Sequence, residues 1–161
     1  MIKSILVWLL ATAILIPAPA TNAQQPGKIF RIGFLNNSTA SGSTVLVKVF
    51  HEELSKLGWI DGKNIDIEYR FGESKGSAHM RELAADLVRL KADLIVVTGT
   101  AATLAAKNTT TTIPIVMTSP ADPVGTGLVA SLARPAGNVS GLSSLGTELN
   151  TKRLEVLKDA I

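Results

Sequence analysis

Cysteine is absent from this sequence of 161 residues. Its absence excludes disulfide bonds, thiolate nucleophiles, cysteine-based metal sites and a lipid-modified cysteine. Histidine occurs only twice, and aromatic residues make up 4% of the chain. The sequence has no block of basic residues, and once Lys3 is set aside the remaining lysines and arginines nearly balance the 13 acidic residues. Nucleic-acid binding is therefore not indicated.

The first long apolar run, Ile5–Ile16, lies close to the N-terminus between Lys3 and two prolines. This run is too short for a membrane-spanning helix, which needs roughly 20 residues, so an uncleaved anchor is the weaker alternative. A positive residue, a short apolar run and small residues before a cut are typical of a secretory signal peptide. We expect residues 1–23 to be such a signal, cleaved after Ala23 rather than after Ala20.

The remainder is expected to comprise a flexible leader at residues 24–28 and one α/β lobe at residues 29–161. A cleaved signal without a lipid-modified cysteine predicts an exported, soluble product. In a Gram-negative bacterium the expected location is the periplasm.

Apolar strand-like runs alternate with helical patterns through the expected lobe. We predict strands over residues 29–35, 64–70, 93–97, 113–117 and 138–142, and helices over residues 43–57, 77–90, 101–107, 124–132 and 148–160. This alternation with short connections predicts a doubly wound, mostly parallel five-stranded sheet with helices on both faces. The alternating strand 64–70 belongs near an edge, and Gly58 is a candidate helix C-cap.

Two of the predicted helices have an apolar stripe that assigns their core face. In the helix over 43–57 the stripe is Val45, Val49, Leu54 and Leu57; in the helix over 77–90 it is Met80, Leu83, Ala84, Leu87 and Leu90. Residues at this spacing share one side of a helix, so we expect each stripe to face the sheet.

Ligands of doubly wound sheets bind outside the carboxyl ends of the strands. The loops expected there are rich in serine, threonine and asparagine, and helix N-termini at Ser43, Thr100 and Val124 add backbone N–H groups suited to a carboxylate. Each hydroxyl could instead cap its own helix. Asp122 has the same two interpretations, as a partner for a ligand amino group or as a cap. Glu73 is either a cleft residue or a solvated loop charge.

Catalysis finds little support in the sequence. His51 and His79 lie in predicted helices, have no nucleophile or second metal ligand at a suitable spacing, and are expected to be solvent-exposed. No G-x-S-x-G elbow and no P-loop occurs. Residues 125–130 fit G-x-G-x-x-A, but they follow the fourth strand instead of the first. We expect no enzymatic activity, cofactor or metal.

A set of motifs spread over the whole of residues 29–161 carries a family resemblance. The motifs are Ile32–Leu35, Leu57–Ile65, Ile67–Arg70, Leu83–Val88, Thr98–Thr100, Ile113–Val116, Asp122–Val129, Ser131–Pro135, Gly137–Leu142 and Lys152–Glu155. Together they resemble the N-terminal lobe of an ABC transporter substrate-binding family, of the tryptophan/tyrosine or general amino-acid type.

The resemblance implies a type I periplasmic-binding-protein fold, in which two α/β lobes close on a ligand and present it to permease subunits in the membrane. It implies ligand contacts from three loops of this lobe: Asn36, Asn37, Ser38, Thr98, Gly99, Thr100, Ser119, Asp122, Pro123 and Val124.

The expected function is the extracytoplasmic solute-binding component of an ABC importer, which holds a small organic solute, for example one of the amino-acid type, without chemistry. The alternative is an exported ligand-sensing or partner-binding module with no transport role. Because family members carry a second lobe, we expect this chain to be a fragment or a truncated product.

Overall fold

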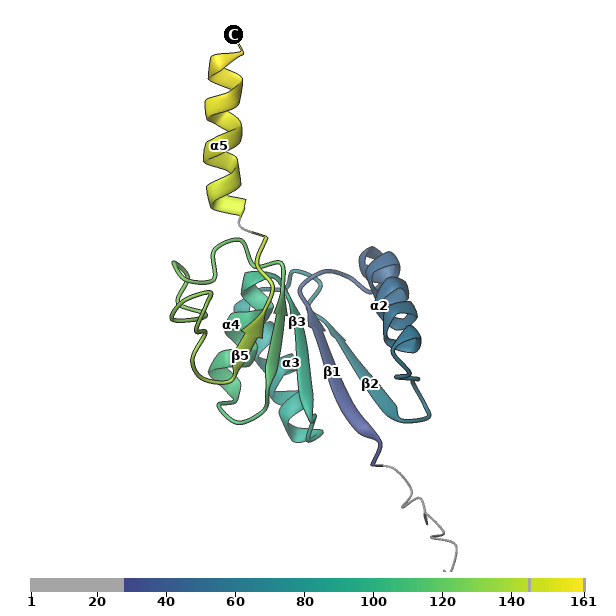
Figure 1. Ribbon diagram of the computed structural model, residues 1–161. Coiled ribbons are helices and arrows are strands. Elements are labelled where there is room, and N and C mark those ends of the chain that lie inside the picture. Colours follow the sequence, from purple (N-terminus) through teal and green to yellow (C-terminus); the bar gives the residue numbers. More distant parts are fainter. Residues whose placement is uncertain (1–27, 145, 161) are drawn as a thin grey trace, which may run out of the picture.

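The computed structural model describes residues 28–144 and 146–160 of the chain. The predicted signal peptide and its cleavage site lie outside these residues. The elements, shown in Figure 1, are β1 (Phe30–Asn36), η2 (Ser41–Ser43), α2 (Thr44–Lys56), β2 (Ile65–Phe71), α3 (Ser77–Arg89), β3 (Leu94–Thr98), α4 (Gly99–Thr109), β4 (Ile115–Thr118), β5 (Val139–Gly141) and α5 (Gly146–Asp159).

The five strands form one sheet in the order β2-β1-β3-β4-β5, and every neighbouring pair is parallel. Helices α3 and α4 lie on one face of this sheet and α2 lies on the other (Figure 1). The predicted α/β class, the parallel sheet and the helices on both faces are therefore confirmed. The alternating strand β2 is an edge strand, as its pattern predicts.

The larger core lies between the sheet and helices α3 and α4. Helix α3 contributes Met80, Ala84 and Leu87, all fully or nearly fully buried, which confirms the stripe predicted for that helix. Alanines of α4 pack beside them, because small side chains let the helix approach the sheet closely. Gly33 is needed for the same reason, since a Cβ there would lie 2.9 Å from Leu87 Cδ1.

The smaller core lies beneath α2 and is mainly aromatic. Phe34 is buried, and its ring centroid lies 5.5 Å from those of Phe50 and Tyr69. Helix α2 packs on this cluster through Val47, Phe50 and Leu54. The predicted core face of this helix is therefore wrong apart from Leu54, and Val45, Val49 and Leu57 are exposed. The helix has apolar residues on two sides, and the aromatic residues of the sheet select the side with Phe50.

The helix predicted over residues 124–132 is also wrong, because this segment consists of turns. Leu128 and Val129 reach the core as turn residues, and their N–H groups bond to Pro123 O. Gly127 has a φ of +69°, which a helix cannot accommodate. The apolar residues of this segment are therefore spaced by which turn residues are buried, and not by the period of a helix.

Helix α5 follows β5 and projects away from the sheet (Figure 1). Its apolar side chains Leu149, Leu154, Val156 and Leu157 are exposed on the described part of the chain. None of the helices within residues 28–144 and 146–160 combines the length and apolar character that crossing a membrane requires.

Truncating a leucine on the buried face of α3 should destabilise the protein far more than truncating the exposed leucine at the end of α2. Leu87→Ala should lower the free energy of unfolding by about 2–5 kcal/mol, because it opens a cavity beneath α3. Leu57→Ala, at a side chain that is 75% exposed, should change it by no more than about 0.5 kcal/mol. Urea denaturation followed by circular dichroism measures both; a large effect of Leu57→Ala would show that α2 packs through the face we describe as exposed.

Candidate functional site

The carboxyl ends of the strands form a continuous row along one edge of the sheet. In the parallel register Asn36 is opposite Phe71 on one side and Thr98 on the other, and Thr98 is opposite Thr118. Because all pairs are parallel, the loops that follow these residues leave from the same edge. We call this edge, with residues 36–43, 71–76, 98–100, 118–126 and 141–144, the carboxyl edge.

The loop after β1 is exposed and carries hydroxyl groups. Ser38, Thr39 and Ser41 lie on its surface, and Gly42 N donates to Thr39 Oγ1 at 3.0 Å. The side chain of Asn36, by contrast, is buried and does not face the solvent at this edge. Asn37 is half-buried, and its Oδ1 is shielded from solvent without a partner among the described residues.

The turn after β2 is hydrogen-bonded to the loop after β1. The N–H groups of Gly72 and Ser74 donate to Asn36 O and Asn37 O at 2.7 and 2.8 Å. Glu73 and Ser74 both adopt positive φ, 50° and 56°, a conformation that costs free energy in residues other than glycine. The hydrogen bond from Lys75 lowers the pKa of Glu73. Glu73 is thus an exposed, ion-paired loop charge, as one of its two interpretations predicts.

Helix α4 starts at the centre of the carboxyl edge with its N-terminal N–H groups uncapped by the Thr98 side chain. Thr118 Oγ1 donates to Thr98 Oγ1 at 3.3 Å and to Val97 O at 3.2 Å, and therefore ties the two central strand ends together. Gly99 has a φ of +80°, which sends the chain directly from the strand into the helix. Thr98, Gly99 and Thr100 are all half-buried here.

In the loop after β4, Asp122 stabilises a turn instead of a helix. Its Oδ1 accepts a hydrogen bond from Gly125 N at 2.7 Å, and a Cβ on Gly125 would lie 2.1 Å from its Oδ2. Pro123 is buried and Val124 is exposed. Val124 begins no helix, so the helix N-terminus expected at that residue does not exist.

Ser119 is exposed at the start of the same loop and has a φ of +56°. The loop after β5 is joined to it, because Ser143 Oγ and Ser144 N both donate to Pro120 O, at 3.0 and 3.1 Å. The two loops therefore support each other at the end of the row.

A hollow of about 430 Å³ borders the carboxyl edge between β2 and α2. It is lined by Ala40, Thr44, Val47, Lys48, Tyr69 and Phe71. The rings of Tyr69 and Phe71 stack with an interplanar angle of 4°. The sequence does not predict this hollow, because it depends on which side of α2 faces the sheet.

The two histidines are less exposed than predicted. His51 is half-buried, and its Nε2 is hydrogen-bonded to the Tyr69 hydroxyl; His79 is half-buried beside Glu82. Neither histidine belongs to a possible metal site, since residues 28–144 and 146–160 contain no cluster of three His, Cys, Asp or Glu side chains that could hold one.

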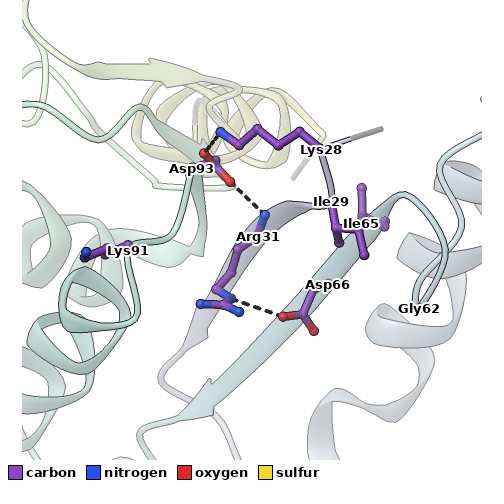
Figure 2. Close-up of a pocket in the computed structure, with 8 residues that line it drawn as sticks. All are labelled: Lys28, Ile29, Arg31, Gly62, Ile65, Asp66, Lys91 and Asp93. Carbon is purple, nitrogen blue, oxygen red and sulfur yellow. Dashed lines mark hydrogen bonds and ion pairs between the residues drawn. The ribbon is translucent and has the colours of Figure 1, made fainter. Parts of the chain in front are cut away.

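A larger hollow, of about 570 Å³, lies at the opposite edge, where the strands begin (Figure 2). Four of its five charged residues bond to one another: Arg31 Nε lies 3.1 Å from Asp66 Oδ2, Arg31 N donates to Asp93 at 2.9 Å, and Lys28 pairs with Asp93. The hydrogen bond from Lys28 lowers the pKa of Asp93. These contacts join β1 to β2 and β3, so we interpret this hollow as structural.

Comparison with known proteins shows the family of the chain. The family described as "ABC transporter substrate binding protein" matches residues 38–161. A protein from Clostridioides difficile named "Tyrosine-binding protein" is 42% identical over 96 residues, which cover 60% of this chain and 28% of that protein.

Solved structures give the same result. A ligand-free, open substrate-binding protein with adhesive properties from Clostridium difficile is 34% identical, with a TM-score of 0.66 over 71% of this chain and 39% of that chain. A Streptococcus pneumoniae protein in complex with L-Trp is 27% identical, with a TM-score of 0.66 over 72% and 39%. The chain thus spans about two fifths or less of the length of these relatives.

Tyr69, the only tyrosine of the chain, provides a spectroscopic test of the aromatic core beside this edge. Burial, with a smaller contribution from Asp61, raises the pKa of Tyr69 to about 12. In the unfolded chain the value should be about 10. The folded state therefore loses stability as the pH rises from about 10 to about 12, because ionisation is then favoured only after unfolding.

The absorbance of the phenolate at about 295 nm, recorded against pH, measures both values. Without urea it gives the pKa of Tyr69 in the folded state, and in about 8 M urea it gives the pKa in the unfolded state. A folded-state midpoint near 10 would contradict the half-buried position of the phenol.

Proposed function

Because the chain belongs to the ABC transporter substrate-binding protein family, we propose that its carboxyl edge is one half of a binding site for an amino acid. The N–H groups at the start of α4 hold the ligand carboxylate in this proposal. The hydroxyl groups of the loops after β1 and β4 complete the polar contacts. The protein binds its ligand unchanged and carries out no reaction.

The uncapped N-terminus of α4 is the observation that carries this proposal. Among the described residues the Thr98 side chain makes no capping hydrogen bond, and the helix start lies between two strand ends with polar side chains. Unpaired N–H groups and the positive end of the helix dipole both favour a carboxylate. Hydrogen bonds to a charged group contribute about 1.5–3 kcal/mol each.

The relatives supply the class of ligand. One is named for tyrosine and another was solved with L-Trp, so we infer an aromatic amino acid for this chain as well. Of the ten residues implied by the resemblance, all except the buried Asn36 and Pro123 have the exposure needed for direct contact. Asp122 offers its second carboxylate oxygen to the ligand amino group, while Pro123 shapes the loop and Val124 adds apolar surface.

A site of this kind needs a second lobe to bury the ligand. We propose that the apolar side chains of α5 pack on that lobe, since they have no partner surface on the described sheet. In the whole protein, residues 1–23 direct export to the periplasm, residues 24–28 form the leader and residues 29–161 form the first lobe. Permease subunits of an importer then receive the ligand.

Isothermal titration of the chain fused to the second lobe of a family relative tests the proposed function. L-tryptophan, L-tyrosine and L-isoleucine serve as probes, and we expect one aromatic amino acid to bind at micromolar or tighter affinity. The 161-residue chain alone should bind far more weakly, because one lobe leaves the ligand exposed. Chemical conversion of a probe, or no binding of any of them, would contradict the proposal.

The carboxylate contact has its own matched control. Replacing L-tryptophan by L-tryptophanamide removes the negative charge and preserves the indole ring and the amino group. We expect the affinity to fall by about tenfold or more, as loss of a charge-assisted hydrogen bond implies. Equal affinities for the acid and the amide would show that the N-terminus of α4 does not hold the carboxylate.

A further inference from the structure

Asn36 occupies an unusual position at the end of β1, because its polar side chain points into the protein. It is 7% exposed, and both ends of its amide are bonded within the loop that follows. Its Oδ1 accepts a hydrogen bond from Ser38 N at 3.0 Å. Its Nδ2 donates to Ser43 Oγ at 3.1 Å. Because Asn36 is buried and each end of its amide already has a partner inside the loop, its side chain is not available to a ligand at the surface.

Ser43 continues this connection to the other side of the loop. Its hydroxyl is part of a side chain that is 2% exposed, and it donates to Thr39 O at 2.8 Å while accepting from Asn36. The two buried side chains therefore link the start of the loop, its middle and the first turn before α2. The residues between Asn36 and Ser43 include Ser38, Thr39 and Ser41, whose side chains are exposed.

The exposed side chains of this loop are thereby held in a compact arrangement. Thr39 Oγ1 lies 3.2 Å from Ser41 Oγ, and a Cβ on Gly42 would lie 2.9 Å from Ser38 Oγ. Glu73 N donates to Ser38 O at 3.2 Å from the turn after β2. The turn after β2 therefore holds residues 36–38 through backbone bonds, and the buried bonds of Asn36 and Ser43 connect them to residues 39–43.

We infer that Asn36 is a positioning residue that orders the loop of Ser38, Thr39 and Ser41 for ligand binding through Ser43. This inference rests on the proposed function and changes the role of Asn36 from ligand contact to internal support. Ordering the hydroxyl groups before the ligand arrives reduces the entropy that binding must offset. The affinity thus depends on a side chain that the ligand never touches.

The test compares Asn36→Ala with Thr110→Ala in the full chain. Thr110 is a suitable control because it is also buried, at 8% exposure, and its Oγ1 accepts hydrogen bonds from Thr112 N and Ile113 N at 3.3 and 3.2 Å. Those contacts hold a turn at the opposite edge of the sheet. Both substitutions remove a buried polar group that supports a loop, but only one of the loops belongs to the proposed site.

Hydrogen exchange followed by mass spectrometry is the first readout. Asn36→Ala should raise the exchange rate of peptides covering residues 37–43 by about tenfold, the effect of losing one buried hydrogen bond. Thr110→Ala should leave those peptides unchanged and accelerate residues 110–114 instead. Unchanged exchange at residues 37–43 in Asn36→Ala would overturn the inference.

The second readout is the affinity for L-tryptophan in the two-lobed protein. Asn36→Ala should weaken binding by about tenfold, whereas Thr110→Ala, at an equal drop in melting temperature, should not change it. Equal losses in both variants would reduce Asn36 to a general stabilising residue and overturn the inference. If the wild-type protein binds none of the amino acids, the proposed function fails, and hydrogen exchange alone decides whether Asn36 orders the loop.

Ser43→Ala keeps the test decisive if Asn36→Ala does not fold. It removes the same connection from the other side and preserves the bond between Asn36 and Ser38 N. We expect it to accelerate exchange in the same peptides, and the double variant to show less than the sum of the two single effects, because the two side chains share one hydrogen bond. Additive effects would show two independent roles.

Discussion

Parallel pairing of β1 with β2 and β3 is the constraint on which the rest of the structure depends. It brings Asn36, Phe71 and Thr98 to the same level, and the pairing of β3 with β4 adds Thr118. In an antiparallel sheet the loops after these residues would alternate between two edges. Here they all leave from one edge, so short segments from distant parts of the chain meet there, and the hydrogen bond between the Thr118 and Thr98 hydroxyl groups joins two of them.

Because the loops gather at one sheet edge, their backbone groups lie beyond the hydrogen bonds of the sheet, and polar side chains provide partners for some of them. Loops at a sheet edge lose the backbone hydrogen bonds of the strands, and their N–H and C=O groups need other partners. Buried or half-buried groups supply them: Asn36 and Ser43 for the loop after β1, and Asp122 for the loop after β4. The start of α4 also lacks a side-chain cap, and it lies at the centre of the carboxyl edge, which is why we propose it as the place for the ligand carboxylate.

The strands and the edge they share could be predicted from the sequence, because alternating and continuous apolar runs have a direct structural cause. The core face of α2 could not, since Val45, Val49 and Phe50 are all apolar and only the aromatic residues of the sheet decide among them. Turns around Gly127 imitate helical spacing by burying Leu128 and Val129. The inward direction of Asn36 depends on the path of the following loop, which no local pattern reveals.

The central claim is that ligand binding occurs at the carboxyl edge and not at the charged hollow where the strands begin. Amide chemical shifts of the ¹⁵N-labelled two-lobed protein, titrated with L-tryptophan, test this claim most directly. The account predicts that the largest changes occur at Ser38, Thr100 and Ser119, while Asp66 and Lys91 beside the hollow of Figure 2 stay unchanged. Changes centred on Asp66 and Lys91, with none at the start of α4, would contradict it.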